Sequence, residues 1–247
     1  MTSKLTVGGL FSGVGGIELA FKKAGFDISW ANDIDSYAHK TYQSIMGSDH
    51  YVGNTPLSIE QLLTPKYRDQ ITQVDVLVGG FPCQAFSIAG YRKGFDDERG
   101  NLFFRIVDLL KYLKIASELP KALLLENVKN FKTHDNKNTY NEVKKQLGKL
   151  GYSVYTKILN TKDYTNIPQN RERTFIVCFR GESVWNDFSI DELSDFSSDF
   201  ESIYYNKTIL ENCKSTVGFD RAFRNLSSGK KTLPIHSFLD LKTILSI

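Results

Sequence analysis

Hydrophobic and polar positions follow two different periodicities along the first 180 residues of the chain. Apolar runs or period-two alternation predict strands at residues 5–11, 27–33, 74–80, 122–127, 152–160 and 173–179. Apolar positions three and four apart predict helices at residues 15–24, 36–46, 102–113 and 140–150. Because strands and helices follow one another in regular order, the pattern predicts an α/β fold with a doubly wound, mainly parallel sheet and helices on both faces.

Residues with known capping preferences flank two of the predicted helices. Gly25 and Gly151 follow apolar helical segments and are suitable stops, because glycine readily adopts the left-handed conformation that often ends a helix. Thr139 and Glu142 have the spacing of a capping box, which predicts that the last helix begins with Thr139 as its N-cap.

The residues with the most chemical potential directly follow predicted strands. They are residues 11–16, Asp33, Pro82 with Cys83, and Glu126 with Asn127. In an open parallel sheet, ligands bind outside the carboxyl ends of the strands. We therefore expect these residues to lie together and to form the functional site.

The chain changes character after residue 180. Residues 182–202 are acidic and rich in serine, and the sequence stays polar and weakly periodic up to Pro234. Helical spacing returns at residues 237–247. We predict a first domain at residues 1–181 and a loop-rich extension at residues 182–247.

The composition is that of an ordinary globular protein and excludes only a few classes of protein and site. Of 247 residues, 41% are hydrophobic and 24% charged, and the net charge of +3 fits a nucleic-acid binder without arguing for one. Cys83, Cys178 and Cys213 are far apart and odd in number, which disfavours a disulfide framework or zinc site and favours a reducing cytoplasm. The four histidines show no metal-ligand spacing, and no apolar run is long enough to span a membrane.

The sequence FSGVGG at residues 11–16 joins the first predicted strand to the first predicted helix. Glycines there allow a tight turn and close approach of a ligand to the backbone, and the helix N-terminus offers free N–H groups. A plain strand-to-helix turn explains the glycines equally well. However, Asp33 lies twenty residues after Gly13, where an acid can accept hydrogen bonds from ribose hydroxyls. That spacing favours a nucleoside-containing cofactor.

Three further features have both a catalytic and a structural interpretation. Cys83 follows a proline in a glycine-bounded loop and is a candidate nucleophile, although free cysteines are more often inert buried residues, as we interpret Cys178. Glu126 ends a buried strand, where it could hold or deliver a proton or simply pair with a helix dipole. Arg171 and Arg173 occupy alternate positions at the entry to a strand, which suits a phosphate or carbonyl oxygen but also an ordinary surface pair.

The order of these motifs is more specific than any one of them. LFSGVGG, NDID, GGFPCQAFSIAG, LLLENV and PQNRERTFIVCF follow one another along the chain. This series strongly resembles the DNA (cytosine-5)-methyltransferase family over residues 5–180. The resemblance implies a Rossmann-like methyltransferase fold, S-adenosylmethionine as cofactor, and methyl transfer to C5 of cytosine in double-stranded DNA.

The resemblance also implies catalytic roles. Cys83 matches the cysteine that attacks C6 of a cytosine flipped out of the duplex. Glu126 matches the residue that holds N3 and the exocyclic amine of that cytosine. Arg171 and Arg173 match the pair that supports the base and the reacting centre. The loop after the cysteine is expected to close over DNA, with these residues toward the substrate: Gln84, Ser87 and Arg99.

A second group of residues matches the cofactor pocket of the family. Its members are Phe11, Gly13, Gly15, Gly16, Asp33, Ile34, Asn54, Pro82 and Leu102. Phe11 is expected to stack on the adenine and Asp33 to hold the ribose hydroxyls. Ile34 departs from the pattern because a bulky aromatic residue is common there. Asn54 stands where an aspartate usually meets the adenine amine, and its amide oxygen can still accept that hydrogen bond.

The third departure from the family concerns the end of the chain. Family members usually continue with a target-recognition domain and a final cofactor motif, and we find neither after residues 239–247. We therefore expect the alpha-type subunit of a split enzyme, which works in a bacterial restriction–modification system and receives DNA recognition from a second polypeptide. Two alternatives are an inactive truncated fragment and an RNA (tRNA) cytosine-5 methyltransferase.

Overall fold

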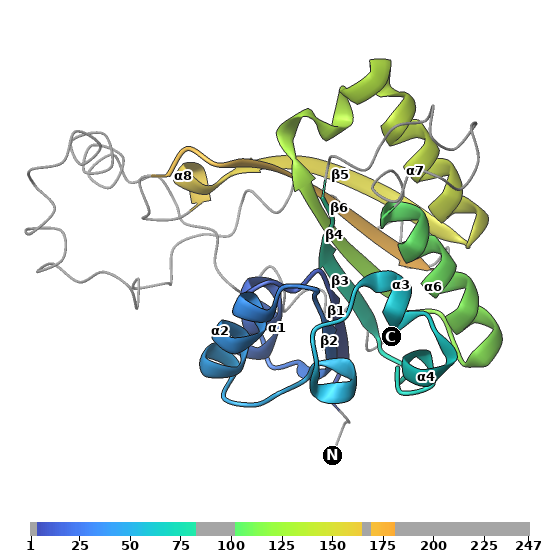
Figure 1. Ribbon diagram of the computed structural model, residues 1–247. Coiled ribbons are helices and arrows are strands. Elements are labelled where there is room, and N and C mark those ends of the chain that lie inside the picture. The colour runs from blue at the N-terminus through green and yellow to red at the C-terminus, as the bar shows by residue number, and fades with distance from the viewer. Residues whose placement is uncertain (1–3, 83–101, 165–168, 181–247) are drawn as a thin grey trace, which may run out of the picture.

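The protein is built on one mixed β-sheet. Its computed structural model describes residues 4–82, 102–164 and 169–180. Within these residues, six strands are arranged in the order β2-β1-β3-β4-β6-β5 (Figure 1). The strands are β1 (Thr6–Leu10), β2 (Asp27–Asn32), β3 (Val76–Gly80), β4 (Ala122–Val128), β5 (Tyr152–Asn160) and β6 (Glu172–Arg180).

Strand direction divides the sheet into two parts. β1 to β4 pair in parallel, whereas β6 runs antiparallel to both β4 and β5. The carboxyl ends of β1 to β4 and the amino end of β6 therefore lie at one end of the sheet, which we call the carboxyl end. The predicted mainly parallel sheet is confirmed. The reversed direction of β6 is not encoded in the apolar pattern, because periodicity reports which face is buried and not which way a strand runs.

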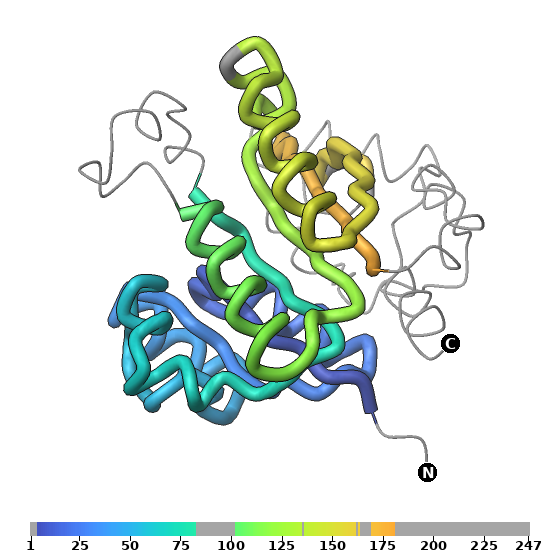
Figure 2. Tube along the Cα trace, turned by 90° about the vertical axis from the view of Figure 1, so that its right-hand side faces the viewer, coloured from blue at the N-terminus to red at the C-terminus, as the bar shows by residue number. Residues whose placement is uncertain are grey.

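Helices cover both faces of this sheet, as a doubly wound fold requires. The α-helices are α1 (Gly16–Lys23), α2 (Ser36–Met46), α3 (Ile59–Leu62), α4 (Pro65–Arg68), α6 (Leu102–Ala116), α7 (Asn138–Lys149) and α8 (Thr161–Tyr164). The 3-10 helices are η1 (Val52–Asn54), η3 (Lys129–Lys132) and η4 (His134–Lys137). Figure 1 shows α1 and α2 on one side of the sheet and α6 and α7 on the other, and Figure 2 looks onto α6 and α7.

Two apolar layers hold the helices to the sheet. Ile106 and Leu110 of α6 pack in one buried cluster with Leu77 of β3. Phe21 of α1 packs in a second cluster with Val76, the neighbour of Leu77 in the same strand. Because successive strand residues point to opposite faces, β3 must be apolar on both, which explains its continuous hydrophobic run.

The start of α7 differs from the prediction. The helix begins at Asn138, after Lys137 in a left-handed conformation with a φ of 70°, and Thr139 is not its N-cap. Thr139 is buried, and its hydroxyl forms a 2.7 Å hydrogen bond with Nδ1 of His134. The predicted capping box is therefore wrong, because a contact with the preceding turn engages the hydroxyl that such a cap would need.

Composition-based expectations can also be compared with the structure. Cys178 is fully buried in β6, as predicted, and burial raises the pKa of its thiol. The described residues contain no group of three or more His, Cys, Asp or Glu side chains that could hold a metal ion. In the same part of the chain, no helix combines the length and apolar character that crossing a bilayer requires.

Candidate functional site

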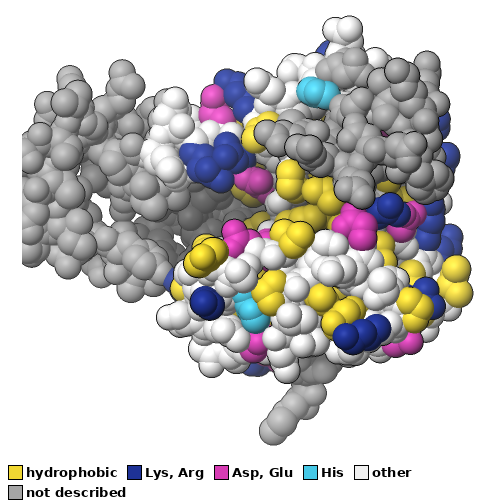
Figure 3. Space-filling model, viewed as in Figure 1, with side chains coloured by type: hydrophobic (Ala, Val, Ile, Leu, Met, Phe, Trp, Pro, Cys, Tyr) yellow, Lys and Arg dark blue, Asp and Glu magenta, His cyan; other side chains and the backbone are white. Residues whose placement is uncertain are grey.

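Several of the predicted site residues meet at the carboxyl end of the sheet. β1 leads into residues 11–16, β2 into Asp33 and β3 into Pro82, and β4 carries Glu126 near its end. In the space-filling view of Figure 3, basic and acidic side chains lie next to each other above a hollowed part of the surface, with hydrophobic side chains beside it. The structure thus brings the described members of the set together, while their roles remain predictions.

The loop at residues 11–16 has a backbone shape that few residue types can adopt. Phe11, Gly13 and Gly15 have positive φ angles of 53°, 53° and 86°. At Gly15 a side chain would also press against the ring of Tyr42 on α2. The Gly15 N–H donates to the Ser12 carbonyl at 2.8 Å and closes the turn into α1. The glycines in FSGVGG therefore satisfy both the turn and the close packing of α2.

Asp33 is joined to this loop by its carboxylate. The Gly13 N–H donates to Asp33 Oδ2 at 2.8 Å, and the Asp35 N–H donates to Oδ1 at 2.9 Å. Each oxygen keeps a second lone pair, so Asp33 can also accept hydrogen bonds from a ligand. The Leu57 N–H donates to the Asp33 carbonyl at 2.9 Å and brings the segment after η1 alongside.

The other predicted cofactor positions differ in exposure. Ile34 is 68% exposed, so its apolar side chain is free to cover a ligand. Asn54 is exposed at the end of η1 with a φ of 51°, a left-handed conformation that asparagine tolerates well. Leu102 begins α6 and is half-buried against the core, and Pro82 is exposed beyond β3. The departures from the family pattern thus lie on accessible surface.

The loop has the open space that a nucleoside cofactor needs. Apart from the adjoining residues of the chain, a Cβ atom added to Gly13 or Gly16 would meet no atom of the described residues within 4 Å. The free N–H groups in the first turn of α1 belong to this region, and Asp33 supplies acceptors for sugar hydroxyls. The residues present therefore fit a cofactor of this class.

Glu126 is held by two guanidinium groups. Nε of Arg173 lies 2.8 Å from Glu126 Oε1, and Nη2 of Arg171 lies 4.0 Å from the same oxygen. The side chains of Glu126 and Arg173 are only 21% and 24% exposed, whereas that of Arg171 is 49% exposed. Oε2 lies toward Gly80, 3.4 Å from where a Cβ of that glycine would be. The two arginines do share one side, and the acid that they contact is the predicted catalytic glutamate.

The reversed direction of β6 explains how the arginines reach Glu126. Arg173 pairs with Val128 of β4, and residues two apart on facing antiparallel strands share a face and come within reach of each other. Arg171 lies just before β6, and its N–H donates to Oδ1 of Asn160, the last residue of β5, at 3.1 Å. Both neighbouring strands thus position the pair.

Asn127 was expected among the residues that follow apolar strands, but the sequence assigned it no role. Its buried side chain donates from Nδ2 to the Phe81 carbonyl at 3.0 Å and accepts the Val128 N–H at Oδ1 at 2.8 Å. Phe81 directly precedes Pro82 and Cys83, so Asn127 ties β4 to the start of the predicted nucleophile segment. Its place at the end of an apolar strand is the signal that marks it in the sequence, and the partners of its buried amide come from the structure.

Four predicted residues lie outside the part of the chain that the structure describes. They are Cys83, Gln84, Ser87 and Arg99. The predicted extension at residues 182–247 also lies outside it. These predictions remain untested by the geometry.

Glu18 is a buried residue whose importance is not evident from the sequence. It lies in the first turn of α1, is 1% exposed, and packs its carboxyl onto Gly9 of β1, where any side chain would overlap it. Burial raises the pKa of Glu18 to about 7, although the nearby Ser12 hydroxyl opposes part of the rise. Oε2 has no hydrogen-bond partner among the described residues. The buried face of α1 therefore contains a titratable group below the loop.

Glu18→Gln is expected to flatten the pH dependence of stability. Because the pKa of Glu18 in the folded protein lies above its ordinary value of 4.5, the folded state keeps a proton that the unfolded chain releases. The contribution of Glu18 to the free energy of unfolding should fall as the pH rises from 4.5 to about 7, by about 3 kcal/mol in total. Urea unfolding between pH 5 and pH 8 measures this slope.

The control for this experiment is Glu60→Gln on α3, whose side chain is 46% exposed. That variant should keep the slope of the wild type. An unchanged slope in Glu18→Gln would show that the buried carboxyl does not govern the pH dependence.

Comparison with known proteins adds the final observations. Residues 5–232 match the family model described as "C-5 cytosine-specific DNA methylase". The Type II methyltransferase M.Bsp6I of Bacillus sp. (strain RFL6) is 43% identical over 187 residues, which cover 75% of this chain and 55% of that protein. The Type II methyltransferase M.HhaI of Haemophilus parahaemolyticus is 40% identical over 193 residues, which cover 77% and 54%.

A solved structure has the same architecture. The S. pombe Dnmt2 methyltransferase superposes with a TM-score of 0.62 and 25% sequence identity, over 81% of this chain and 56% of that one. The Rossmann-like methyltransferase fold expected from the resemblance is confirmed. The chain spans about half the length of the curated relatives described above.

Proposed function

The chain belongs to the C-5 cytosine-specific DNA methylase family, and we propose that it provides the cofactor-binding and catalytic part of a DNA (cytosine-5)-methyltransferase. The observation that carries this proposal is the contact of Arg173 and Arg171 with Glu126, at the same end of the sheet as the bond between Asp33 and Gly13. Glu126 and its two arginines suit a base with donor and acceptor atoms. Asp33 and the Gly13 backbone suit a nucleoside cofactor.

S-adenosylmethionine is the proposed cofactor, and when bound it supplies an electrophilic methyl group. Asp33 accepts hydrogen bonds from its ribose hydroxyls, because both carboxylate oxygens have a lone pair left after binding backbone N–H groups. The open backbone at Gly13 and Gly16 allows close approach. Phe11 and the exposed Ile34 cover the adenine.

Cys83 is the proposed nucleophile. Its thiolate forms a bond to C6 of a flipped cytosine, and the electrons of the C5–C6 double bond move to C5. C5 would then form a bond to the methyl carbon that the bound cofactor supplies, as the bond from that carbon to the sulfonium sulfur breaks and S-adenosylhomocysteine is left. Loss of the C5 proton to solvent water and cleavage of the sulfur–C6 bond restore the aromatic ring and the free thiolate.

Glu126 binds the polar edge of the cytosine in this proposal. Its carboxyl accepts a hydrogen bond from the exocyclic amine and stabilises the protonated form of N3 as negative charge builds on the ring. The contacts of Arg173 and Arg171 with Oε1 fix the carboxyl, which leaves Oε2 on the side of Gly80, at the end of β3 that leads to Cys83. Preorganised charges of this kind lower the barrier without moving during the reaction.

DNA recognition is proposed to come from a second polypeptide, as we expect from the sequence. The matched region covers 55% of M.Bsp6I and 54% of M.HhaI. Both are named Type II methyltransferases, which supports a place in a restriction–modification system.

The test is methyl transfer from isotopically labelled S-adenosylmethionine to duplex DNA and, separately, to tRNA. The chain is assayed alone and together with the product of the adjacent reading frame. Methylation of C5 in duplex DNA by the mixture supports the proposal. Methylation by the chain alone removes the need for a partner, preference for tRNA makes RNA the substrate, and cofactor binding without any transfer favours an inactive protein.

Asp33→Asn is expected to weaken binding of S-adenosylmethionine about tenfold or more, because a charged acceptor is lost. In this variant, the side-chain NH₂ of the new asparagine would also face the backbone N–H of Gly13 or of Asp35, so that two donors oppose each other. Isothermal titration calorimetry measures the dissociation constant. The matched control is Asp27→Asn at the opposite end of β2, where the aspartate forms an exposed ion pair with Lys4. Equal affinity of the two variants would contradict the proposed role of Asp33.

A further inference from the structure

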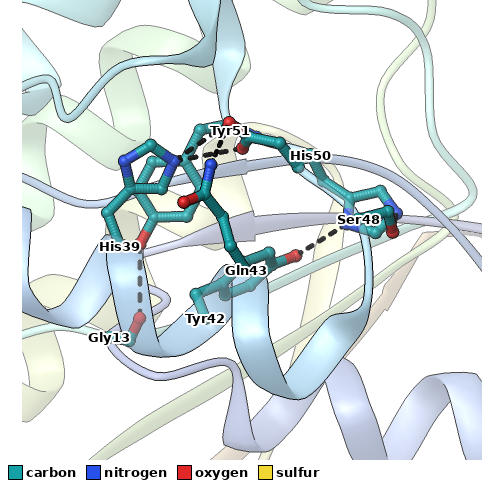
Figure 4. A network of polar contacts seen from close by, with 8 residues as sticks. Gly13, His39, Tyr42, Gln43, Ser48, His50 and Tyr51 are labelled. Carbon is teal, nitrogen blue, oxygen red and sulfur yellow. Dashed lines mark hydrogen bonds and ion pairs between the residues drawn. The ribbon is translucent and has the colours of Figure 1, made fainter.

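The hydroxyl of Tyr51 reaches the loop at residues 11–16 from a distant part of the sequence. It donates a hydrogen bond of 3.2 Å to the carbonyl of Gly13 (Figure 4). The N–H of the same glycine donates to Asp33 at 2.8 Å. Gly13 is therefore held on both sides, by a side chain that follows β2 and by one that precedes η1.

The ring of Tyr51 is fixed by two aromatic neighbours on α2. It stacks on His39 with ring centroids 4.2 Å apart and an interplanar angle of 21° (Figure 4). Tyr42 meets it at 5.0 Å and 64°. Tyr51 is only 3% exposed, so its hydroxyl has little freedom to leave Gly13.

The backbone around Tyr51 is fixed as well. Its N–H donates to Oδ1 of Asp49 at 2.9 Å, and both carboxylate oxygens of Asp49 lie 3.1 Å from Nε2 of His39. The preceding carbonyl, of His50, accepts the N–H of Ala31 in β2 at 2.7 Å. Tyr51 is thus tied both to the sheet and to α2 and forms a rigid support below the loop.

The protonation state of the Tyr51 hydroxyl suits a donor. Burial raises its pKa, and the negative charges of Asp33, Glu18, Asp49 and Asp35 raise it further. The group therefore stays protonated at neutral pH and can donate to the Gly13 carbonyl throughout the working range.

We propose that Tyr51 is a positioning residue for the cofactor, which holds the Gly13 peptide in the conformation that presents the loop and Asp33 to the ligand. The inference rests on the proposed binding of S-adenosylmethionine at this loop. Gly13 has a left-handed φ of 53° and open space on its free side, so its backbone hydrogen bonds are the restraints that define its orientation. Tyr51 lies outside all the motifs that carry the family resemblance.

Tyr51→Phe tests this inference because it removes only the hydroxyl and keeps the stacked ring. The dissociation constant for S-adenosylmethionine should rise about three- to tenfold, the effect of losing one neutral hydrogen bond that is needed in the bound state. Isothermal titration calorimetry with the full chain measures it, and S-adenosylhomocysteine, which shares the nucleoside, should lose affinity by the same factor. The melting temperature is recorded for each variant.

Tyr42→Phe is the matched control. Tyr42 is also fully buried in this network, but its hydroxyl bonds to Nδ1 of His50 at 3.3 Å instead of to the loop (Figure 4). This variant should change the affinity by less than about twofold, since it leaves Gly13 untouched.

The outcomes separate the inference from the proposed function. If the wild-type chain binds neither ligand, the proposed function fails first. If the wild type binds and Tyr51→Phe binds equally well, Tyr51 has no positioning role. Parallel losses of affinity and melting temperature in both variants would likewise overturn the inference, because they would indicate general loosening of the fold.

Discussion

Replacing Cys83 with serine is expected to reduce DNA methylation by at least about 1,000-fold while cofactor binding stays unchanged. A serine hydroxyl is almost never ionised at neutral pH, whereas a thiol is readily activated, so the first bond to C6 would hardly form. The assay is methyl transfer by the chain together with any polypeptide that it requires. If the Cys83→Ser variant methylated DNA at the wild-type rate, the proposed covalent mechanism would be excluded.

A trapping experiment tests the role of Cys83 without requiring the enzyme to turn over. DNA with 5-fluorocytosine at the target has no C5 proton to lose, so the sulfur–C6 bond should persist as a protein–DNA adduct that survives denaturing electrophoresis. Cys83→Ser should give no such adduct. Cys178→Ala is the control, because Cys178 is fully buried in β6 and burial disfavours its thiolate. Loss of the adduct in both variants would point to a folding defect.

Glu126→Gln should lower the methylation rate about 100- to 10,000-fold, the range for loss of a positioned acid–base group. Glutamine has no negative charge to stabilise a proton on N3, and it leaves Arg173 and Arg171 without their anionic partner. Single-turnover methyl transfer measures the effect on the chemical step. A rate close to that of the wild type would exclude Glu126 from catalysis.

Glu172→Gln is a close control for Glu126. Glu172 lies between the two arginines in the sequence but forms an ion pair of 2.7 Å with Lys129 instead. Its removal should leave the methylation rate within about threefold of the wild type, as expected for an exposed ion pair. An equal loss in Glu172→Gln would indicate that net charge, and not the position of Glu126, determines activity.

Periodicity was sufficient to predict the layout of the fold. The predicted helix at residues 36–46 and strand at residues 152–160 coincide with α2 and β5. The rule that ligands bind beyond the carboxyl ends of parallel strands then predicts that Asp33 and Glu126 lie at one end of the sheet. Short-range order and one topological rule therefore predict where the site lies.

The features that the sequence did not predict are contacts and burial that arise in the tertiary structure. Tyr51 reaches Gly13 across 38 residues, and Asn127 reaches Phe81 across 46. Glu18 is polar yet buried, which its position on the helix does not indicate. The hydrophobic pattern predicts whether a residue is buried or exposed, but it does not predict which residue of another element it contacts. Partners of buried polar groups are therefore the part of the site that needed the structure.

The antiparallel pairing of β6 with β4 links core packing to the sign of the charge beside Glu126. A slip of β6 by a single residue would move Glu172 to the position of Arg173 and confront Glu126 with another carboxylate. The same slip would turn the buried Ile176 and Cys178 out of the apolar layer. A β6 strand in the wrong register would therefore lose hydrophobic burial. The apolar side chains of β6 thus select the register that places an arginine, and not a carboxylate, beside Glu126.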